Sequence, residues 1–359
     1  MTTPESIGQQ GLRLVDASLN RLAEGLRYLE DTARFLLNDG SITEQLKSLR
    51  HALVASDWQF QKQLLDSRDV YGDVGVGVQV PDAEKPHDLP SSVVANSRRV
   101  QEALRTLEEY SKVGALPVHL SSARLEAARF EVYSIEKGLV GRLLRQDGAK
   151  RIHGLYVIVD TEALKGRDHA EVTRLVIRGG ATIVQLRDKT MDRGRLLPIA
   201  QAMKQVCEGN GALFFINDYL DLALAVQADG LHVGQTDLPV AVVRKLVPLD
   251  MLVGCSVYNV GQAVKAQADG ADYVAVGALF PTPSKESVVV GLDALRRVKQ
   301  AASVPVVAIG GITLDNTAAV KAAGADSICV ISAVLGAPSP EKAARKLLER
   351  FEVEDGKTD

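Results

Sequence analysis

Two basic side chains separated by a single residue are the first candidates for chemistry in this chain of 359 residues. Arg187 and Lys189 follow Thr182–Leu186, an apolar run of the kind that forms a strand buried on both faces. Alternate residues of an extended segment point the same way, so the two cations should face one ligand. An arginine that holds two oxygens, with a lysine beside it, suits a polyanion such as a diphosphate. The alternative is that they pair with surface acids such as Asp188.

Two carboxylates follow the next two apolar runs and indicate a metal site. Asp218 comes after Leu213–Ile216, and Asp237 comes shortly after Gly230–Val233. If these runs are neighbouring strands, their ends share one rim, where two carboxylates repel unless a cation lies between them. Oxygen ligands together with a diphosphate are the usual surroundings of Mg²⁺. The alternative is that one aspartate, Asp237 above all, caps the helix that follows.

A glycine pair, Gly310-Gly311, and the dipeptide Ile331-Ser332 follow the last two apolar runs. Backbone amides that glycine leaves uncovered, just before a helix begins, form a common phosphate-binding cup. A side chain at the glycine positions would block the close approach of a phosphate. These residues therefore predict a phosphate site, with a plain tight turn as the alternative.

Other polar residues near the ends of the runs favour substrate binding. Thr282, Ser284 and Lys285 lie in a proline-rich loop, where hydroxyls and a lysine can clamp an anion. The alternative for this loop is a rigid surface segment. Gln185 offers both a donor and an acceptor, as recognition of a heterocycle requires. His232 is either a residue of the rim or a hydrogen-bonded residue of the interior.

The residues after position 152 predict an α/β fold. Short runs that are apolar throughout, as in parallel strands covered on both faces, alternate with helical stretches. Eight such runs in about 200 residues favour a (β/α)8 TIM barrel over a doubly wound open sheet. In a barrel, the strand ends that carry the residues above share one rim. The predicted strands are Leu155–Val159, Thr182–Leu186, Leu213–Ile216, Gly230–Val233, Leu252–Val257, Tyr273–Leu279, Val306–Ile309 and Ser327–Ile331.

The first 145 residues predict a mostly α-helical domain instead. Apolar residues recur at steps of three and four from Leu12 to Ala33, which is a helical stripe. Three further helices fit residues 42–66, 91–113 and 119–144. A loop rich in glycine, and then in proline, separates the first two helices from the last two.

An internal repeat lies within these helices. Residues 21–30 and 99–108 share arginine, glutamate and leucine at six corresponding positions, among them Arg27 and Arg105. The repeat indicates a duplicated helix pair that faces itself across a pseudo-twofold axis, or simply two similar amphipathic helices. The arginines and glutamates are candidates for polar work. The alternative is that they form pairs three residues apart on a solvated helical face.

The mostly helical pattern and the alternating strand and helix pattern define the two predicted domains. A polar stretch with a glycine, residues 146–150, separates them. We expect a mostly helical N-terminal domain over residues 1–146, a barrel domain over 152–350 and a charged tail over 351–359.

Composition excludes several classes of protein. The formal net charge is -3, so nothing favours a nucleic-acid or anionic-membrane partner. The three cysteines have no metal-ligand or redox spacing, and the first ten residues lack the apolar core of a signal peptide. No apolar run approaches the roughly 18 residues that span a bilayer. We expect a cytoplasmic protein with small-molecule substrates, and a homo-oligomer is as compatible with the sequence as a monomer.

Residues 152–345 resemble the thiamine-phosphate synthases, also called thiamine-phosphate pyrophosphorylases, along nearly their whole length. Serine at position 284 replaces a threonine of the family pattern and keeps its hydroxyl, and Asp188 stands where the family often has glutamate. The shared motifs are Gln-x-Arg-x-Lys at Gln185–Lys189, Asn-Asp at Asn217-Asp218, His-x-Gly-Gln-x-Asp at His232–Asp237, Gly-x-Ser at Gly254–Ser256, Pro-Thr-x-Thr-Lys at Pro281–Lys285, Gly-Gly-Ile at Gly310–Ile312 and Val-Ile-Ser at Val330–Ser332.

The resemblance implies a condensation without a protein nucleophile. Hydroxymethylpyrimidine diphosphate loses pyrophosphate to give a pyrimidine-stabilised cation, and the nitrogen of a thiazole phosphate, or of its carboxylated tautomer, attacks it. Mg²⁺ on Asp218 and Asp237 would stabilise the leaving group. The implied catalytic residues are Arg187, Lys189 and Lys285. The implied binding residues are Gln185 and Asn217 for the pyrimidine, Ser256 for the diphosphate, and Thr282, Ser284, Gly311, Ile331 and Ser332 for the thiazole phosphate.

The first 145 residues resemble a helical domain that is fused ahead of this synthase in some bacteria and has been proposed as an alternative hydroxymethylpyrimidine-phosphate kinase. That role implies ATP as a partner, although the sequence has no P-loop. The alternative is a non-catalytic module for dimerisation or docking. For the barrel, the alternatives are a thiazole tautomerase and a phosphosugar enzyme of the indole-glycerol-phosphate synthase type. The intact pyrimidine-side set disfavours the first, and a catalytic lysine–glutamate set expected of the second is not evident.

Overall fold

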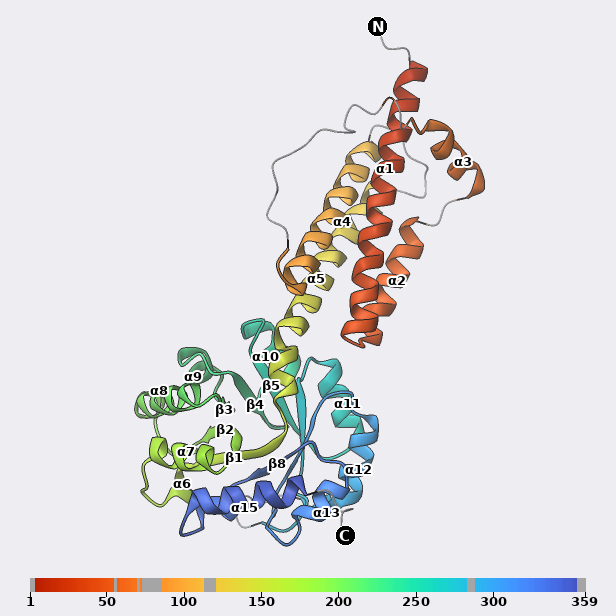
Figure 1. Ribbon diagram of the computed structural model, residues 1–359. Helices are drawn as coiled ribbons and strands as arrows, with labels where there is room; N and C mark the ends of the chain where they lie inside the picture. The colour runs from red at the N-terminus through yellow and green to blue at the C-terminus, as the bar shows by residue number, and fades with distance from the viewer. Residues whose placement is uncertain are drawn as a thin grey trace. The chain divides into compact units, whose positions relative to one another are not determined.

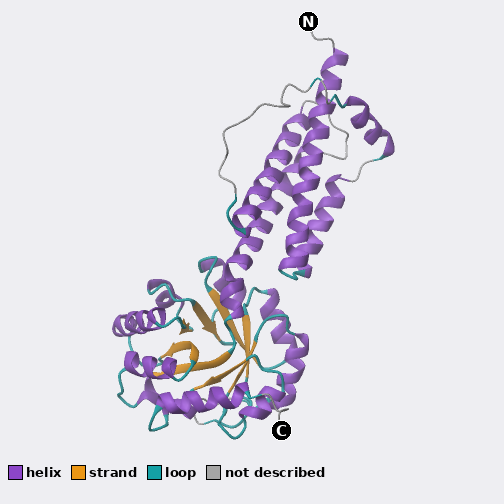
Figure 2. Cartoon of the chain, viewed as in Figure 1, coloured by secondary structure: helices purple, strands orange, loops and turns teal. Residues whose placement is uncertain are grey.

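The computed structural model describes residues 4–54, 57–69, 72, 86–112, 121–282 and 288–353, with side chains described from residue 10 onward. The chain divides into two compact units, Met1–Leu144 and Arg145–Asp359. Helices make up the first unit, and strands and helices alternate through the second (Figures 1 and 2). None of the described helices combines the length and the apolar character needed to cross a bilayer.

The second unit is a closed barrel of eight parallel strands, each hydrogen-bonded to its neighbours in chain order (Figure 1). The predicted α/β fold, a TIM barrel preceded by a helical region, is confirmed. Almost every strand residue is buried, because helices cover the outside and side chains fill the inside. The strands are β1 (Gly154–Asp160), β2 (Ala181–Arg187), β3 (Leu213–Asn217), β4 (Gly230–Val233), β5 (Leu252–Val257), β6 (Tyr273–Val276), β7 (Val306–Ile309) and β8 (Ser327–Val330).

Helices follow each strand and form the outer layer, as Figure 2 shows. Their apolar faces pack on the strands in one continuous core that includes Phe214, Met203 and Phe351. The helices are α6 (Thr161–Leu164), α7 (His169–Arg178), α8 (Arg193–Gly209), α9 (Leu220–Ala225), α10 (Val240–Leu246), α11 (Val260–Ala268), α12 (Gly291–Ala301), α13 (Thr317–Ala322), α14 (Ser332–Leu335) and α15 (Pro340–Glu352).

Two sequence boundaries in this unit need correction. The sixth strand ends at Val276 rather than at the expected Leu279, and a Cβ at the next residue, Gly277, would lie 2.1 Å from the carbonyl oxygen of Ile309. The backbone of Leu279 nevertheless donates to the carbonyl of Ile309 at 3.0 Å. Phe351 and Glu352, which we assigned to the tail, end α15, and the Phe351 side chain is buried. Residues 354–359 lie outside the described part of the chain.

A layer of aromatic rings fills the barrel interior. The rings of Tyr156, Phe215 and Tyr273 meet with centroids 5.7–6.3 Å apart. All three side chains are almost completely buried, and they are among the largest fully buried residues of the chain. Burial of such rings is a large share of the apolar stabilisation of any barrel interior. The layer also forms the floor on which the rim residues stand.

The N-terminal end of the barrel is closed by the last turn of α5 (Ser122–Lys150) and the residues after it. Arg145 is buried, forms an ion pair with Asp272 at 2.8 Å and donates to the carbonyl of Leu249 at 2.6 Å. Ile152 packs in the interior cluster of the barrel. Residues 146–150, the polar stretch that we took as the boundary between domains, are therefore helical and are part of the structure that closes the barrel.

The first unit contains α1 (Pro4–Asp31), the π-helix η1 (Thr32–Leu36), α2 (Gly40–Val54), α3 (Trp58–Ser67), α4 (Leu89–Lys112) and most of α5. The single helix expected over residues 42–66 is wrong, because α2 ends at Val54 and α3 begins at Trp58. The side chain of Asp57 accepts a hydrogen bond from the backbone nitrogen of Phe60 at 2.8 Å. This N-cap starts a new helix where the apolar period alone predicts continuation.

The two copies of the internal repeat lie on helices that pack against each other. Helices α1 and α4 lie against each other, and a Cβ at Gly25 would lie 2.5 Å from a Val100 side-chain carbon. The glycine therefore permits the close approach of the two helices. Leu26 and Leu29 of the first copy, and Leu104 and Leu107 of the second, are fully buried in the shared core.

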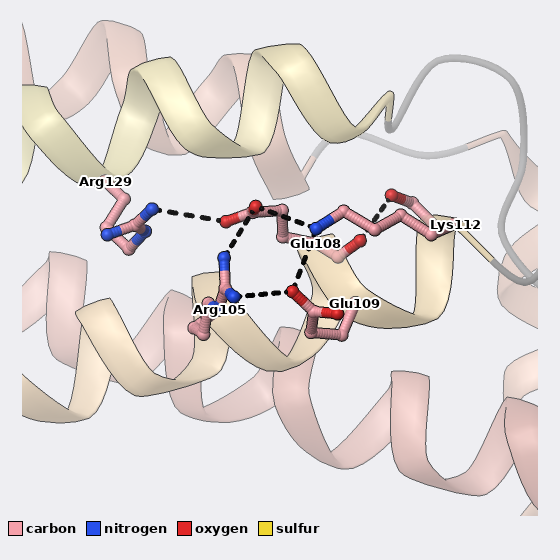
Figure 3. A network of polar contacts seen from close by, with 6 residues as sticks. Arg105, Glu108, Glu109, Lys112 and Arg129 are labelled. Atoms are coloured by element: carbon pink, nitrogen blue, oxygen red, sulfur yellow. Dashed lines mark hydrogen bonds and ion pairs between the residues drawn. The ribbon is translucent and has the colours of Figure 1, made fainter.

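The repeated arginines and glutamates form two similar ion-pair networks. In the second copy, Glu108 is 3% exposed and contacts Arg105 at 2.8 Å, Lys112 at 3.3 Å and Arg129 of α5 at 3.4 Å (Figure 3). In the first copy, Glu30 is 4% exposed and contacts Arg50 of α2 at 2.9 Å.

The first copy also has the pairing along the helix, with Arg27 and Glu30 at 3.7 Å. Pairs three residues apart are therefore present in both copies, but Glu30 and Glu108 do not lie on a solvated face. Each buried carboxylate joins two helices of the unit.

The Glu108 network links stability to pH. Burial by itself would raise the pKa of Glu108, but hydrogen bonds from Lys112 and Arg105 outweigh burial and lower that pKa. A folded-state pKa below the unfolded one contributes stability above the unfolded pKa, and this contribution disappears as pH falls through the folded value.

We predict that Glu108→Gln lowers the free energy of unfolding of the helical unit by about 1–2 kcal/mol at pH 7. The loss should shrink below about pH 4.3, where Glu108 is protonated in the unfolded wild-type chain. Urea unfolding of the full-length protein, followed by circular dichroism at both pH values, measures it. Glu131→Gln, at an exposed position of α5, is the matched control and should change little. An equal loss of unfolding free energy at pH 7 and below about pH 4.3 would contradict the link between Glu108 ionisation and stability.

Candidate active site

A cavity opens at the carboxyl ends of the barrel strands. It is lined by side chains or backbone from all eight strands and from several of the turns that follow them. Ten residues singled out from the sequence line it: Gln185, Arg187, Asn217, His232, Ser256, Thr282, Gly310, Gly311, Ile331 and Ser332. The register explains the convergence, since Asn217 pairs with His232 and Ile158 pairs with Gln185 across neighbouring strands.

In the Gln185 side-chain amide, the nitrogen is hydrogen-bonded, whereas the oxygen has no partner among the described residues. The residue is 1% exposed, and its Nε2 donates to the Tyr156 hydroxyl at 2.6 Å. Its Oε1 is buried and has no hydrogen-bond partner among the described residues. A buried acceptor without a partner is unfavourable, so a ligand that donates a hydrogen there would restore the lost bond. An amino group on a heterocycle is such a donor.

Arg187 is held by an acid that the sequence analysis did not select. Its guanidinium pairs with Oδ2 of Asp160, the last residue of β1, which is 6% exposed. The other oxygen of Asp160 caps α6 by accepting from the backbone nitrogen of Ala163 at 3.0 Å. Asp160 is thus fixed by the helix and in turn fixes Arg187. The sequence contained a signal for it, because Asp160 follows the first apolar run, Leu155–Val159, as Asp218 follows the third.

Asp218 is the centre of the acidic part of the rim. Its carboxylate pairs with Lys189 and accepts a hydrogen bond from Nδ2 of Asn217 at 2.6 Å. Its backbone has φ +61°, a left-handed conformation that is uncommon outside glycine. Burial raises the pKa of Asp218, Lys189 opposes this, and Asp237 adds to it. The two carboxylates are therefore close enough to repel each other.

The second carboxylate is fixed by the backbone. Oδ2 of Asp237 accepts from the backbone nitrogen of Gly234 at 2.8 Å, so it braces its own turn rather than capping the following helix, α10, as the alternative had it. No cluster of three or more histidine, cysteine or acidic ligands occurs in the described part of the chain. Two carboxylates that repel each other still suit a Mg²⁺ ion that takes its other ligands from a diphosphate and water.

The glycine pair after β7 has a left-handed backbone conformation that favours glycine. Gly310 and Gly311 have φ +94° and +66°. A Cβ at Gly311 would lie 2.6 Å from the carbonyl oxygen of Pro281, so no other residue fits without movement of the backbone. Ile331 and Ser332 stand at the start of α14 on the same wall of the cavity. Thr282 also lines the cavity, whereas Ser284 and Lys285 lie outside the described residues.

His232 is both a hydrogen-bonded residue of the barrel interior and a residue of the cavity lining, the two positions between which the sequence did not decide. It is 8% exposed and hydrogen-bonded within the barrel to Tyr273, yet it also lines the cavity. Its Nε2 lies 2.9 Å from the hydroxyl oxygen of Ser256. The structure thus brings together the polar residues at the ends of β2 to β5, with Lys189, Asp218 and Asp237 beside the lining residues.

Comparison with known proteins decides the family. Residues 155–334 match the family model described as thiamine monophosphate synthase. A thiamine-phosphate synthase of Thermosynechococcus vestitus is 37% identical over 355 residues, which covers 97% of both chains. A thiamine-phosphate synthase of Gloeobacter violaceus is 38% identical over 95% of this chain and 96% of its own. The chain belongs to the thiamine-phosphate synthase family.

The likeness to thiamine-phosphate synthases extends to solved structures and to the helical unit. The structure of thiamine phosphate pyrophosphorylase from Pyrococcus furiosus is 39% identical, with a TM-score of 0.53, and covers 57% of this chain and 97% of that one. Residues 13–138 match a second family model, described as the ThiD2 family. The curated relatives span both regions. As a member of the thiamine-phosphate synthase family, the protein is an enzyme of the transferase class.

We predict that Arg187→Ala weakens binding of inorganic pyrophosphate by about tenfold to a hundredfold, because a charge-assisted contact to the anion is lost. Titration calorimetry on the full-length protein with Mg²⁺ measures the change. Arg193→Ala is the matched control: Arg193 stacks on the Tyr219 ring at 3.6 Å near the same rim and does not line the cavity. Equal weakening by both substitutions would show that only the general positive charge of the rim matters.

Proposed function

We propose that the barrel joins hydroxymethylpyrimidine diphosphate to a thiazole phosphate and releases pyrophosphate. The bond between the pyrimidine methylene carbon and the diphosphate oxygen breaks, and both electrons leave with the pyrophosphate. The resulting cation is stabilised by the pyrimidine ring. The lone pair of the thiazole nitrogen then forms the new carbon–nitrogen bond, giving thiamine phosphate, with loss of carbon dioxide where the carboxylated thiazole is used.

One observation above all supports this reaction. The open acceptor Oε1 of Gln185 and the cation of Arg187 lie two residues apart on β2 and line one cavity. A ligand that fills both contacts needs a heterocyclic donor group at one end and an anion at the other. An aminopyrimidine that carries a diphosphate has both. Asn217, across the strand pair, would complete the recognition of the ring, and Ser256 that of the diphosphate.

The cations of the rim suit the departure of a diphosphate. Negative charge grows on the leaving oxygens, so Arg187, already aimed by Asp160, would stabilise the transition state more than the ground state. Lys189 would do the same once the diphosphate competes with Asp218 for it. Lys285 is assigned to the same task by its place in the family motif alone.

We propose Asp218 and Asp237 as the residues that hold Mg²⁺. When bound, the ion would neutralise charge on the diphosphate. Their donor chemistry fits, because the pKa of Asp218 is raised by burial and by the neighbouring carboxylate, which a divalent cation would relieve. Lys189 would then pass from Asp218 to the substrate.

The opposite wall suits the second substrate. Gly311, Ile331, Ser332 and Thr282 line the same cavity, and the first three would form the glycine-containing cup. We assign the thiazole phosphate to this cup, with Ser284 as a further hydroxyl. The two substrates would then lie across one cavity, with the reacting carbon and nitrogen between them. A thiazole tautomerase would need only this wall, and the pyrimidine-side residues Gln185 and Asn217 argue against it.

The helical unit carries a second candidate function. The match of residues 13–138 to the ThiD2 family favours a phosphorylation of hydroxymethylpyrimidine phosphate by ATP, which would supply the diphosphate substrate. A module for dimerisation or docking is the alternative. We also propose that the enzyme works in the cytoplasm, since Cys207, Cys255 and Cys329 are buried and unpaired, as in a reducing compartment.

We predict that Asp218→Asn and Asp237→Asn each raise the Mg²⁺ concentration for half-maximal synthase activity by about tenfold or more, because one charged oxygen ligand is lost. Asp221→Asn is the matched control, since Asp221 is an exposed acid at the same rim that pairs with Arg193. Activity is followed as thiamine phosphate converted to its fluorescent oxidised form. An unchanged Mg²⁺ requirement in both variants would remove the two aspartates from the metal site.

We predict that the full-length protein with Mg²⁺ and thiazole phosphate makes thiamine phosphate from hydroxymethylpyrimidine diphosphate. A parallel reaction contains the monophosphate and ATP instead. Product in both reactions supports a bifunctional kinase and synthase, whereas product from the diphosphate alone supports the synthase and leaves the helical unit a module. Product in neither reaction contradicts the proposed function.

A further inference from the structure

A row of hydrogen-bonded side chains crosses the floor of the cavity from Gln185 to Ser256. Nε2 of Gln185 donates to the Tyr156 hydroxyl at 2.6 Å, and the hydroxyls of Tyr156 and Tyr273 lie 3.1 Å apart. The Tyr273 hydroxyl lies 2.9 Å from Nδ1 of His232, and Nε2 of His232 lies 2.9 Å from the Ser256 hydroxyl. The two ends line the cavity at places we assign to different parts of one substrate.

The chemistry of the groups gives this row a direction. The amide nitrogen of Gln185 can only donate, so the Tyr156 oxygen accepts, and we assign the single hydrogen of Tyr156 to the bond with Tyr273, the next hydroxyl of the row. Tyr273 then passes its own hydrogen to Nδ1 of His232, which must be unprotonated. The hydrogen of a neutral imidazole is therefore on Nε2 and points to Ser256. Ser256 receives a hydrogen bond and keeps its own hydrogen for the cavity.

The surroundings keep both phenols in the protonation state that this direction needs. Tyr156 and Tyr273 are 1% and 0% exposed. Burial raises the pKa of both phenols well above their usual value, so both hydroxyls keep their hydrogens at any physiological pH. Hydrogen bonds in such a low-dielectric row polarise one another and strengthen along the row. None of this is required for packing, because phenylalanine would fill the same volume.

The geometry points to Tyr156, Tyr273 and His232 as a positioning relay that aims the Ser256 hydroxyl hydrogen at the leaving diphosphate and couples it to the Gln185 amide that reads the pyrimidine. The relay rests on the proposed synthase reaction and adds to it a reason why the floor of the barrel is polar. Tyr156 and Tyr273 act through Gln185 and Ser256. Ring recognition and leaving-group stabilisation are then parts of one hydrogen-bonded unit.

A double-mutant cycle on the full-length enzyme tests the relay. Tyr273→Phe should lower kcat/KM for the pyrimidine diphosphate by about tenfold, as expected for one uncharged hydrogen bond. It should leave KM for the thiazole phosphate within about twofold, since that substrate is assigned to the opposite wall. Ser256→Ala should cost at least as much. The double variant should be no slower than Ser256→Ala alone, because Tyr273 acts through Ser256.

A packing variant provides the matched control. Phe215→Leu disturbs the rings of both tyrosines, whose centroids lie 5.9 and 5.7 Å from that of Phe215, but removes no hydrogen bond of the row. If Phe215→Leu and Ser256→Ala are combined, the fold-loss in kcat/KM should equal the product of the two single fold-losses, because the two effects are independent. If the fold-loss in kcat/KM of the Tyr273→Phe, Ser256→Ala double variant also equals the product of the single losses, Tyr273 is a packing residue and the relay is overturned.

A second measurement does not depend on the variants folding. In wild-type protein labelled with ¹⁵N-histidine, the relay requires His232 to be neutral with its hydrogen on Nε2. The His232 signal is identified by its absence from the His232→Asn spectrum. A hydrogen on Nδ1 overturns the direction of the relay. Failure of the proposed function is a separate result, because it appears as wild-type enzyme that forms no thiamine phosphate from the diphosphate.

Discussion

Closure of eight parallel strands into one ring is the constraint on which the site depends. Parallel strands all end on the same rim, so polar residues that follow separate apolar runs must converge there. The register then sets their neighbours, as when Asp160 lies beside Arg187 on adjacent strands. The same closure creates an interior that side chains must fill to the density of a solid. The side chains that fill this interior therefore pack beneath the rim residues and position them.

The interior of this barrel contains two tyrosines, Tyr156 and Tyr273, where apolar rings would pack as well. Each buried hydroxyl costs free energy unless it is hydrogen-bonded, so Tyr156 and Tyr273 fix each other and their neighbours Gln185 and His232. Among the described residues of this row, Oε1 of Gln185 is the one buried polar atom without a hydrogen-bond partner. The filling of the barrel thus determines which atoms the floor offers to a substrate.

The sequence predicted the barrel well because strands covered on both faces are apolar throughout, and seven of the eight strands begin and end within about one residue of their runs. The rim residues followed from the run ends. The break between α2 and α3 was missed because one cap, at Asp57, outweighs the helical period. Tyr156 and Tyr273 were missed because an aromatic inside an apolar run gives no sign of what its hydroxyl contacts. That contact depends on residues more than a hundred positions away.

In the helical unit, burial of two acids of the repeated motif limits where chemistry can occur. Glu30 and Glu108 are the most suggestive acids of its repeated motif, yet both are buried and held by arginines from two helices. A carboxylate with all its charge paired makes a poor metal ligand or base. The neighbouring Glu24 and Glu102 occupy matching positions of the repeat and are exposed. Any catalytic or nucleotide-binding role of the motif therefore falls to that outer face, while the buried pair joins the helices.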